Sequence, residues 1–174
     1  MTRRPIDAHV SPARTANDHL DDALRGAFAA WASGVSVVSA RDDDGRVYGM
    51  TIAALTPGSI DPPLVLVCIH NDAPLASVLD GGVRCALSIL NEGQKRAATS
   101  FADRFSVGAD LLTGDDVPAV RDAAATLRCT TRDIHDGGDH RIVVLSVDDV
   151  RVAGDEPRPL VYWQRAYRRL TADD

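Results

Sequence analysis

Apolar residues at helical spacing predict a helix near the start of the chain. They fall on one face when the segment is drawn as a helix: Leu20, Leu24, Ala27, Phe28 and Trp31. Asn17 or Asp18 can cap this helix and Gly34 can end it, so we predict a helix over residues 20–32. Residues 1–17 are polar and irregular, and we predict that they are disordered.

Short apolar runs separated by glycine and proline follow, and many are rich in β-branched residues, as is typical of strands. The predicted strands cover residues 35–40, 47–55, 64–69, 84–90, 124–130, 142–152 and 160–163. The run at 64–69 is apolar throughout, so we expect a central strand buried on both faces. The remaining predictions are an Asp-Gly turn at 41–46, a break at 60–63, short helices at 74–79 and 92–101, an irregular stretch at 106–118 and a polar tail at 167–174.

A predicted hairpin near the carboxyl end carries candidate chemistry. Gly137 and Gly138 allow a sharp reversal, because glycine adopts positive φ at little steric cost. Asp139 and His140 come directly afterwards, at the root of the next strand. Imidazole can act near neutral pH, so a histidine held there is a candidate functional residue. A lone histidine at the start of a strand can equally be structural, and the residues alone leave both interpretations open.

Composition and charge exclude several classes of protein. The formal net charge is -6 and the pI is about 5.3, which argues against a nucleic-acid binder, because such proteins usually carry a basic face. No run of about 18 apolar residues is present, so no membrane span is expected. The first residues lack the apolar core of an export signal, and we expect a cytoplasmic protein.

The cysteines indicate neither disulfides nor a metal site. Cys68, Cys85 and Cys129 are odd in number, widely spaced and set in apolar runs. No Cys-x-x-Cys or Cys/His metal spacing occurs, and His135 and His140 lack a third matched ligand. We therefore expect buried, reduced thiols and no bound metal.

The order of elements indicates a mainly β fold. Short strands with marked turns and a few peripheral α-helices are typical of an antiparallel barrel and not of a βαβ sheet. No GxGxxG motif follows a strand and no GxxxxGK[ST] motif occurs, so neither a Rossmann fold nor a P-loop is expected. With 174 residues, of which 45% are hydrophobic, we predict a single domain over residues 18–170.

Several segments resemble, in order, the short-chain flavin reductases. The matching segments are 28–38, 49–51, 59–68 with its Asp-Pro-Pro-Leu-Val motif, 84–90, 101–105 and 136–140 with its Gly-Asp-His ending. The resemblance implies an antiparallel split β-barrel of the Greek-key, FMN-binding type, and a homodimer with flavin bound near its interface. It implies a flavin reductase that uses NADH or NADPH to reduce FMN or FAD, often for a separate flavin-dependent monooxygenase.

The resemblance also implies the residues of the site. The isoalloxazine ring and ribityl chain would lie along Val47, Tyr48, Gly49, Met50, Thr51, Ala53 and Ala54, with Gly49 allowing close approach. The end of the central strand and the phosphate end of the flavin would involve Cys68, Ile69, His70, Pro74, Leu75, Ser100 and Phe101. The pyridine nucleotide would contact Tyr162, Trp163, Gln164 and Arg165. His140 would be the catalytic histidine, positioning the nicotinamide or hydrogen-bonding the flavin, and Asp139 would orient its ring.

The chain departs from the family pattern where hydroxyl groups are common. Alanine stands at positions 53, 54 and 73, proline at 74, and Ser88 replaces a usual asparagine. Each lost hydrogen bond is worth roughly 0.5–1.5 kcal/mol, so flavin affinity is expected to be lower by about one or two orders of magnitude unless backbone amides compensate. Both tight binding and transient binding stay open. Two other functions on the same barrel stay open: a non-catalytic FMN-binding electron carrier, and a flavin-dependent oxidase or monooxygenase.

Overall fold

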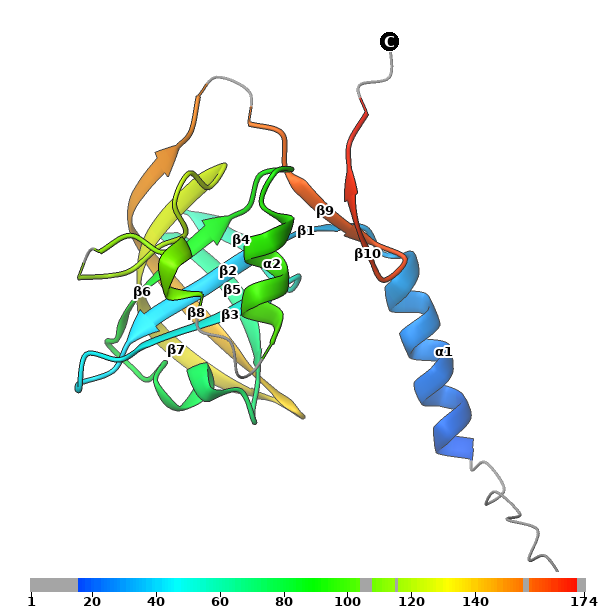
Figure 1. The fold of residues 1–174 in the computed structure, drawn as a ribbon. Coiled ribbons are helices and arrows are strands. Elements are labelled where there is room, and N and C mark those ends of the chain that lie inside the picture. Colours follow the sequence, from blue (N-terminus) through cyan, green and yellow to red (C-terminus); the bar gives the residue numbers. More distant parts are fainter. Residues whose placement is uncertain (1–15, 104–107, 115, 155–156, 172–174) are drawn as a thin grey trace, which may run out of the picture.

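A computed structural model describes residues 16–103, 108–114, 116–154 and 157–171 (Figure 1). Its helical elements are α1 (Ala16–Ala30), η1 (Pro74–Ser77), α2 (Lys95–Ala102) and η2 (Ala109–Leu111). Its strands are β1 (Ser33–Gly34), β2 (Ser36–Arg41), β3 (Val47–Ile52), β4 (Leu55–Ile60), β5 (Pro63–His70), β6 (Arg84–Ile89), β7 (Ala125–Gly137), β8 (His140–Val152), β9 (Leu160–Trp163) and β10 (Ala166–Arg169). The mainly β class is confirmed, and the strand pairs are antiparallel.

Seven strands form one curled sheet, in the order β3-β2-β6-β7-β8-β5-β4. Strands β3 and β4 are its two edges, yet only Ala53 and Ala54 lie between them in the chain. Because so short a link cannot cross a flat sheet, the sheet must curl until its edges approach each other. The result is the predicted split barrel, open between β3 and β4 (Figure 1).

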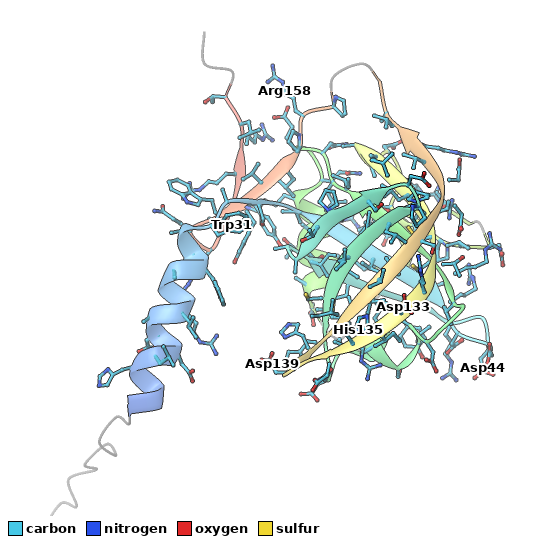
Figure 2. All side chains as sticks on the ribbon, turned by 180° about the vertical axis from the view of Figure 1, so that it is seen from behind. Trp31, Asp44, Asp133, His135, Asp139 and Arg158 are labelled. Carbon is cyan, nitrogen blue, oxygen red and sulfur yellow. The ribbon has the colours of Figure 1, made fainter. Side chains whose placement is uncertain are left out.

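A smaller unit projects from one end of the barrel. Strands β1, β9 and β10 form a three-stranded sheet, and α1 extends from it away from the barrel (Figure 1). Trp31 lies where α1 meets this sheet (Figure 2). Helix α1 thus buries little of its apolar face against the barrel, and Phe28 and Trp31 are 72% and 76% exposed.

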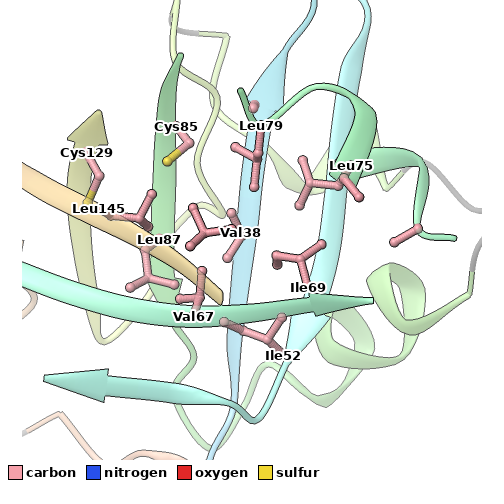
Figure 3. Close-up of a cluster of buried hydrophobic side chains, with 14 of the residues drawn as sticks. Val38, Ile52, Val67, Ile69, Leu75, Leu79, Cys85, Leu87, Cys129 and Leu145 are labelled. Carbon is pink, nitrogen blue, oxygen red and sulfur yellow. The ribbon is translucent and has the colours of Figure 1, made fainter. Parts of the chain in front are cut away.

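Two apolar clusters stabilise the barrel. The first fills its interior, with fully buried side chains such as Val38, Val67, Leu87 and Leu145 drawn from β2, β5, β6 and β8 (Figure 3). The second packs Ala97, Ala98 and Phe101 of α2 against the outside of the sheet. Large apolar side chains of this kind each contribute about 1.5–3 kcal/mol when fully buried. These two clusters therefore stabilise both the barrel and helix α2, which lies next to β3.

The prediction that the 64–69 strand is buried on both faces is wrong. Along β5 the residues alternate: Val67 and Ile69 are fully buried, whereas Leu66 and Cys68 are half-buried on the outer face. Successive side chains of a strand point to opposite faces, and only one face of a barrel strand meets the core. A strand that is apolar throughout therefore places half of its apolar side chains on the outer face of the barrel.

The strand predicted over 47–55 is in fact two strands. Strand β3 ends at Ile52, and β4 begins at Leu55. The last residue of β4, Ile60, falls in the break that was predicted over residues 60–63. Strand β4 contains Pro57 and a register shift between Pro57 and Ser59. An edge strand needs backbone partners on one side only, so it tolerates a proline and a bulge that a central strand would not.

Both ends of the chain also differ from the predictions. The helix begins at Ala16, so Asn17 and Asp18 lie in its first turn and are not its caps. Gly34 belongs to β1, and the predicted tail contains β10, which pairs with β9. These short strands depend on partners far away in the sequence, which local patterns do not reveal. Residues 1–15 and part of the predicted irregular stretch lie outside the described residues.

Candidate active site

A cavity of about 780 Å³ opens where the edge strand β3 meets the ends of β5 and β8. Helix α2 and the turn η1 complete its wall. Its lining consists of Arg46, Val47, Tyr48, Gly49, Met50, Thr51, His70, Ala73, Pro74, Leu75, Phe101, Ala102, Asp103 and His140. Most of these residues are apolar or aromatic, with a few ionisable groups among them. A cavity of this kind suits a flat ring that has polar atoms along one edge.

Strand β3 presents backbone groups to this cavity. It pairs with β2 along one side, and no strand of the described chain pairs with its other side. Edge strands carry a row of N–H and C=O groups that are available to another partner. Residues 47–51 line the cavity, so these groups can hydrogen-bond the polar edge of a bound heterocycle.

Helix α2 holds β3 in place from the outside. The Thr51 hydroxyl donates a hydrogen bond of 2.8 Å to the carbonyl of Ala98. A Cβ atom at Gly49 would lie only 2.7 Å from Cδ1 and Cε1 of Phe101, so a side chain does not fit there. Gly49 was expected to make room for a cofactor, but Phe101 occupies the space beside its Cα. The glycine is needed for helix packing.

His140 is the first residue of β8 and forms a pair with Asp139. Asp139 lies at the tip of the β7–β8 hairpin (Figure 2). Nδ1 of His140 lies 2.6 Å from Oδ1 of Asp139. This hydrogen bond and the charge of His140 lower the pKa of the Asp139 carboxyl below its usual value. Asp139 is therefore a carboxylate that accepts the Nδ1 proton, which leaves Nε2 of His140 for a ligand in the cavity.

Asn71 braces the turn that carries this pair. Its Nδ2 donates to the carbonyl of Gly138 at 2.9 Å, and its backbone N–H donates to the carbonyl of Asp139 at 3.0 Å. Gly138 has a φ of 78°, so the turn needs a residue without a Cβ. The end of β5 thus fixes the hairpin tip.

His70 faces His140 across the β5–β8 ladder. The two residues are directly paired in register, and their ring centroids are 5.0 Å apart at an interplanar angle of 76°. Nδ1 of His70 accepts the backbone N–H of Asp72 at 3.1 Å. Both imidazoles line the cavity, so it contains two histidines with different hydrogen-bond partners.

The structure brings together only part of the predicted site. Ten of the predicted residues line the cavity: Val47, Tyr48, Gly49, Met50, Thr51, His70, Pro74, Leu75, Phe101 and His140. Asp139 lies beside it through its hydrogen bond to His140. The others lie elsewhere. Cys68 and Ile69 precede His70 on β5, and the Ile69 side chain is fully buried in the barrel core, so that side chain cannot contact a ligand.

The other displaced residues belong to three places. Ala53 and Ala54 form the exposed corner between β3 and β4. Ser100 lies on α2 beside a separate, shallow hollow lined by Lys95, Arg96 and Thr99. The predicted nucleotide-binding residues Tyr162, Trp163, Gln164 and Arg165 form the β9–β10 hairpin on the projecting unit, and none of them lines the cavity.

Four lining residues are not among the ten predicted ones. The sequence analysis named Ala73 only as a departure from the family pattern, and it missed Arg46, Ala102 and Asp103. Arg46 immediately precedes β3, and its position next to the Asp-Gly turn was the available signal. Asp103 directly follows α2, where a helix end next to Phe101 could have indicated it. An arginine or an aspartate is not distinctive by itself, so only the fold shows that Arg46 and Asp103 line the same cavity.

Comparison with known sequences assigns the chain to a family. Residues 28–171 match the family described as flavin reductase like domain. The chain belongs to the flavin reductase-like family. The match spans the whole barrel and the β9–β10 hairpin of the projecting unit, so the flavin reductase-like domain includes the cavity and all the strands from β1 to β10.

Relatives with stated activities are similar over most of this flavin reductase-like chain. The reductase component of 4-hydroxyphenylacetate 3-monooxygenase from Thermus thermophilus is 43% identical over 151 residues, which cover 87% of this chain and 97% of the relative. The NADH:riboflavin 5'-phosphate oxidoreductase of Streptomyces pristinaespiralis is 37% identical over 147 residues, covering 82% of this chain and 83% of the relative.

A solved structure supports the same fold. The NADH:FAD oxidoreductase of Streptomyces globisporus superimposes with a TM-score of 0.81 at 28% identity, covering 94% of this chain and all of that one. Among the residues that the structure describes, no helix is long and apolar enough to cross a membrane. The same residues contain no group of three or more His, Cys, Asp or Glu side chains that could hold a metal ion.

Proposed function

We propose that this chain is an NAD(P)H-dependent flavin reductase, which reduces FMN or FAD and supplies the reduced flavin to a separate monooxygenase. The observation that carries this proposal is the cavity in which the free edge of β3 faces the Asp139–His140 pair. The relatives support it, because they are named for flavin reduction by NADH and for the reductase component of a monooxygenase.

The contribution of the protein to this reaction is positioning. Bound flavin accepts a hydride from the nicotinamide ring of NADH or NADPH, a transfer between stacked rings that needs little acid–base help. The backbone of β3 binds the polar edge of the flavin, while Phe101 and Leu75 provide apolar contacts. His140 presents Nε2 to the nicotinamide or the flavin, and Asp139 keeps the imidazole in that orientation.

Flavin is a transient substrate of this enzyme. Ala73 lines the cavity. The family resemblance implies a hydroxyl group at this position, so we infer that this chain has one hydrogen-bond donor fewer at the site. Each such bond is worth roughly 0.5–1.5 kcal/mol, and weaker binding suits a reductase that releases its product. Turnover measured with each pairing of FMN or FAD with NADH or NADPH identifies the preferred substrates.

The domain over residues 18–170 works as a unit in the cytoplasm. Its cysteines Cys68, Cys85 and Cys129 are free thiols, as is usual in a reducing compartment. Nicotinamide and flavin nucleotides are both available there, so no export is needed for the proposed reaction.

The functional form is a homodimer. Leu20 and Phe28 of α1 are 60% and 72% exposed, and Trp31, just after this helix, is 76% exposed. Exposed large apolar side chains gathered in one segment are typical of an interface. The outer face of the barrel is also apolar, since Leu66 of β5 is paired with Val144 of β8 and both are half-buried. A second copy covers both surfaces if α1 of one protomer lies on β5 and β8 of the other.

This dimer explains how the predicted nucleotide residues act at a distance from the cavity. Side chains of β5 alternate in direction, so Leu66, Cys68 and His70 share its outer face. A projecting unit placed on that face therefore lies beside the cavity of its partner. The β9–β10 hairpin, with Trp163 40% exposed, then contributes to nucleotide binding across the interface.

The central test is oxidation of NADH or NADPH by the purified protein with added FMN or FAD. The wild-type protein is expected to turn over, and His140→Ala is expected to lower the rate by about tenfold or more, because the nicotinamide loses a positioning contact. His135→Ala is the matched control, since His135 lies on the same hairpin (Figure 2) but does not line the cavity.

Other outcomes would distinguish the competing functions. Tight flavin binding without oxidation of either nucleotide would indicate an electron carrier and contradict the proposal. Consumption of NADH only when an organic substrate is present would indicate a monooxygenase or oxidase. Equal rates for wild type, His140→Ala and His135→Ala would show that His140 has no part in turnover.

A further inference from the structure

The contact between His70 and His140 is a feature that the proposed reaction does not by itself require. His70 is the last residue of β5 and His140 the first of β8, and the two are cross-strand partners. Their rings meet edge to face, with centroids 5.0 Å apart. Both residues line the cavity. Because the two rings are in contact, a substitution at His70 changes the packing of the His140 ring.

Each ring is held by a separate hydrogen bond at its Nδ1 atom. In His70 this atom accepts the backbone N–H of Asp72, so the ring proton of the neutral form is on Nε2. In His140 the same atom lies 2.6 Å from the Asp139 carboxylate and donates to it. The two imidazoles therefore have opposite roles at Nδ1, and both rings are fixed in rotation about their side-chain bonds.

Several charged groups surround the two histidines. The Asp72 carboxylate lies 4.0 Å from Nδ1 of His70, and Asp139 pairs with His140. Arg141, the next residue of β8, donates to the carbonyl of Ala76 and so faces η1. Arg46 and Asp103 lie on the cavity wall with the two histidines.

We propose that His70 is a positioning residue for the reductase: its ring, locked by the N–H of Asp72, supports the His140 imidazole in the orientation that the bound nicotinamide and flavin require. This inference rests on the proposed function. Asp139 fixes one edge of the His140 ring, and His70 supplies the second contact that stops the ring from tilting about that hydrogen bond. Small errors in orientation are costly for a transfer that depends on stacked rings.

Two substitutions test whether the His70 ring supports His140 by its shape or acts through its nitrogen atoms. His70→Ala removes the ring and is expected to lower kcat by about tenfold, while the KM for flavin changes by less than about threefold. His70→Phe keeps an aromatic ring without its nitrogen atoms and is expected to restore kcat to within about threefold of wild type. His135→Ala, outside the cavity, serves as the control and should match wild type.

The kinetic outcomes decide the proposal. Unchanged kcat in His70→Ala would overturn it, because the ring would then be dispensable. A kcat in His70→Phe as low as that of His70→Ala would also overturn it, because the imidazole nitrogen atoms would then be what matters. A rise confined to the KM for flavin would assign His70 to binding and not to positioning.

A measurement that does not use turnover keeps the inference separate from the proposed function. Long-range proton–nitrogen NMR of the wild-type protein at neutral pH should show His70 with its proton on Nε2 and His140 protonated on Nδ1. The opposite tautomer at His70 would overturn the inference even if His70→Ala fails to fold. Absence of NADH oxidation by wild type together with the expected tautomers would instead overturn the proposed function.

Discussion

At the residue scale, Gly49 illustrates how packing decides a residue type. Glycine weakens a strand, since it has no side chain to pack and loses much backbone freedom on folding. It stands in β3 nevertheless, because Phe101 of α2 lies where its Cβ would be. The aromatic ring thereby reaches both the core and the cavity wall, and Phe101 is only 2% exposed.

Replacing Gly49 with alanine is expected to destabilise the fold and weaken flavin binding. The added methyl group must displace a buried ring, and overpacking of this kind typically costs about 1–3 kcal/mol. Urea denaturation measures the first effect and flavin titration the second. Gly81→Ala is the control, because nothing lies within 4 Å of a Cβ built there. Equal stability of the two variants would contradict this account.

Two buried cysteines illustrate how the core controls chemistry at single residues. Cys85 and Cys129 are direct partners across β6 and β7, with exposures of 0% and 2%. Burial, with a further contribution from the charge of Asp148, raises the pKa of the Cys129 thiol to about 12 and also raises that of Cys85. Both thiols therefore stay protonated and unreactive at physiological pH, as expected of structural cysteines.

The same thiols predict a loss of stability in alkali. From about pH 9.0 the thiols of the unfolded chain ionise, while those of the folded chain stay protonated until far higher pH. The free energy of unfolding therefore falls as the pH rises from about 9 toward 12. Urea denaturation at about pH 7 and about pH 10 measures the fall. A Cys85→Ala/Cys129→Ala variant should lose less over this range, and an identical loss would refute the assignment.

At the scale of elements, the conformation of the β7–β8 hairpin depends on residues within the turn and on a residue distant in the sequence. Its glycines allow the reversal, and Asp136 accepts the backbone N–H of Gly138 at 3.1 Å. The hydrogen bonds from Asn71 then tie the tip to the end of β5. Local sequence forms the turn, and the neighbouring strand determines where the turn points.

Asn71→Ala is expected to lower turnover more than it lowers stability. The substitution removes the bond to Gly138, worth roughly 0.5–1.5 kcal/mol, and frees the hairpin tip that holds His140. NADH oxidation should fall by about threefold or more. Ser77→Ala, which removes an exposed bond to the carbonyl of Pro74, is the control. A rate equal to that of the control would show that the tip is rigid without Asn71.

The strand predictions succeeded where the local sequence pattern was strong. They failed where a segment forms a strand only because it pairs with another strand. Apolar, β-branched residues indicated β2, β5 and β6 close to their observed bounds. In contrast, β4 contains Pro57, and β10 is a short strand with charged residues. Both are strands because β5 and β9 provide backbone partners for them. Hydrogen-bond partners from elsewhere in the chain can outweigh a poor local propensity.

At the scale of the whole molecule, the projecting unit is where we propose that two copies of the chain meet. Helix α1 leaves the barrel with its apolar face uncovered, although isolated helices of this length are marginal in water. A second copy that covers this face would stabilise the helix and bring the β9–β10 hairpin to the neighbouring cavity. In the proposed dimer, the apolar pattern in the first helix reflects an interface between subunits.

A variant carrying both Phe28→Glu and Trp31→Glu is expected to shift the protein from dimer to monomer. Charged groups on this face oppose burial of the interface, and turnover should fall because the partner's hairpin is lost. Size-exclusion chromatography with light scattering measures the mass. Val152→Glu alters another exposed apolar residue, on the far end of β8, and should leave the dimer intact. A wild-type protein that is monomeric at all concentrations would refute the assembly.

The sequence by itself determined the class of the fold, most of the central strands, the glycine hairpin and the membership of a family. These features follow from backbone preferences, side-chain alternation and ordered motifs, all of which act over short stretches of chain. It also determined that His140 stands at a strand root next to an acid.

Only the tertiary structure decided which of the motif residues share a cavity. Ile69 and His70 are neighbours in the chain, yet one points into the core and the other lines the cavity, because the barrel face of each β5 residue is determined by register with β8. Curvature of the sheet brings residues 46–51, 70, 73–75, 101–103 and 140 together and leaves 162–165 outside. Register and curvature depend on contacts between distant residues, which no local pattern specifies.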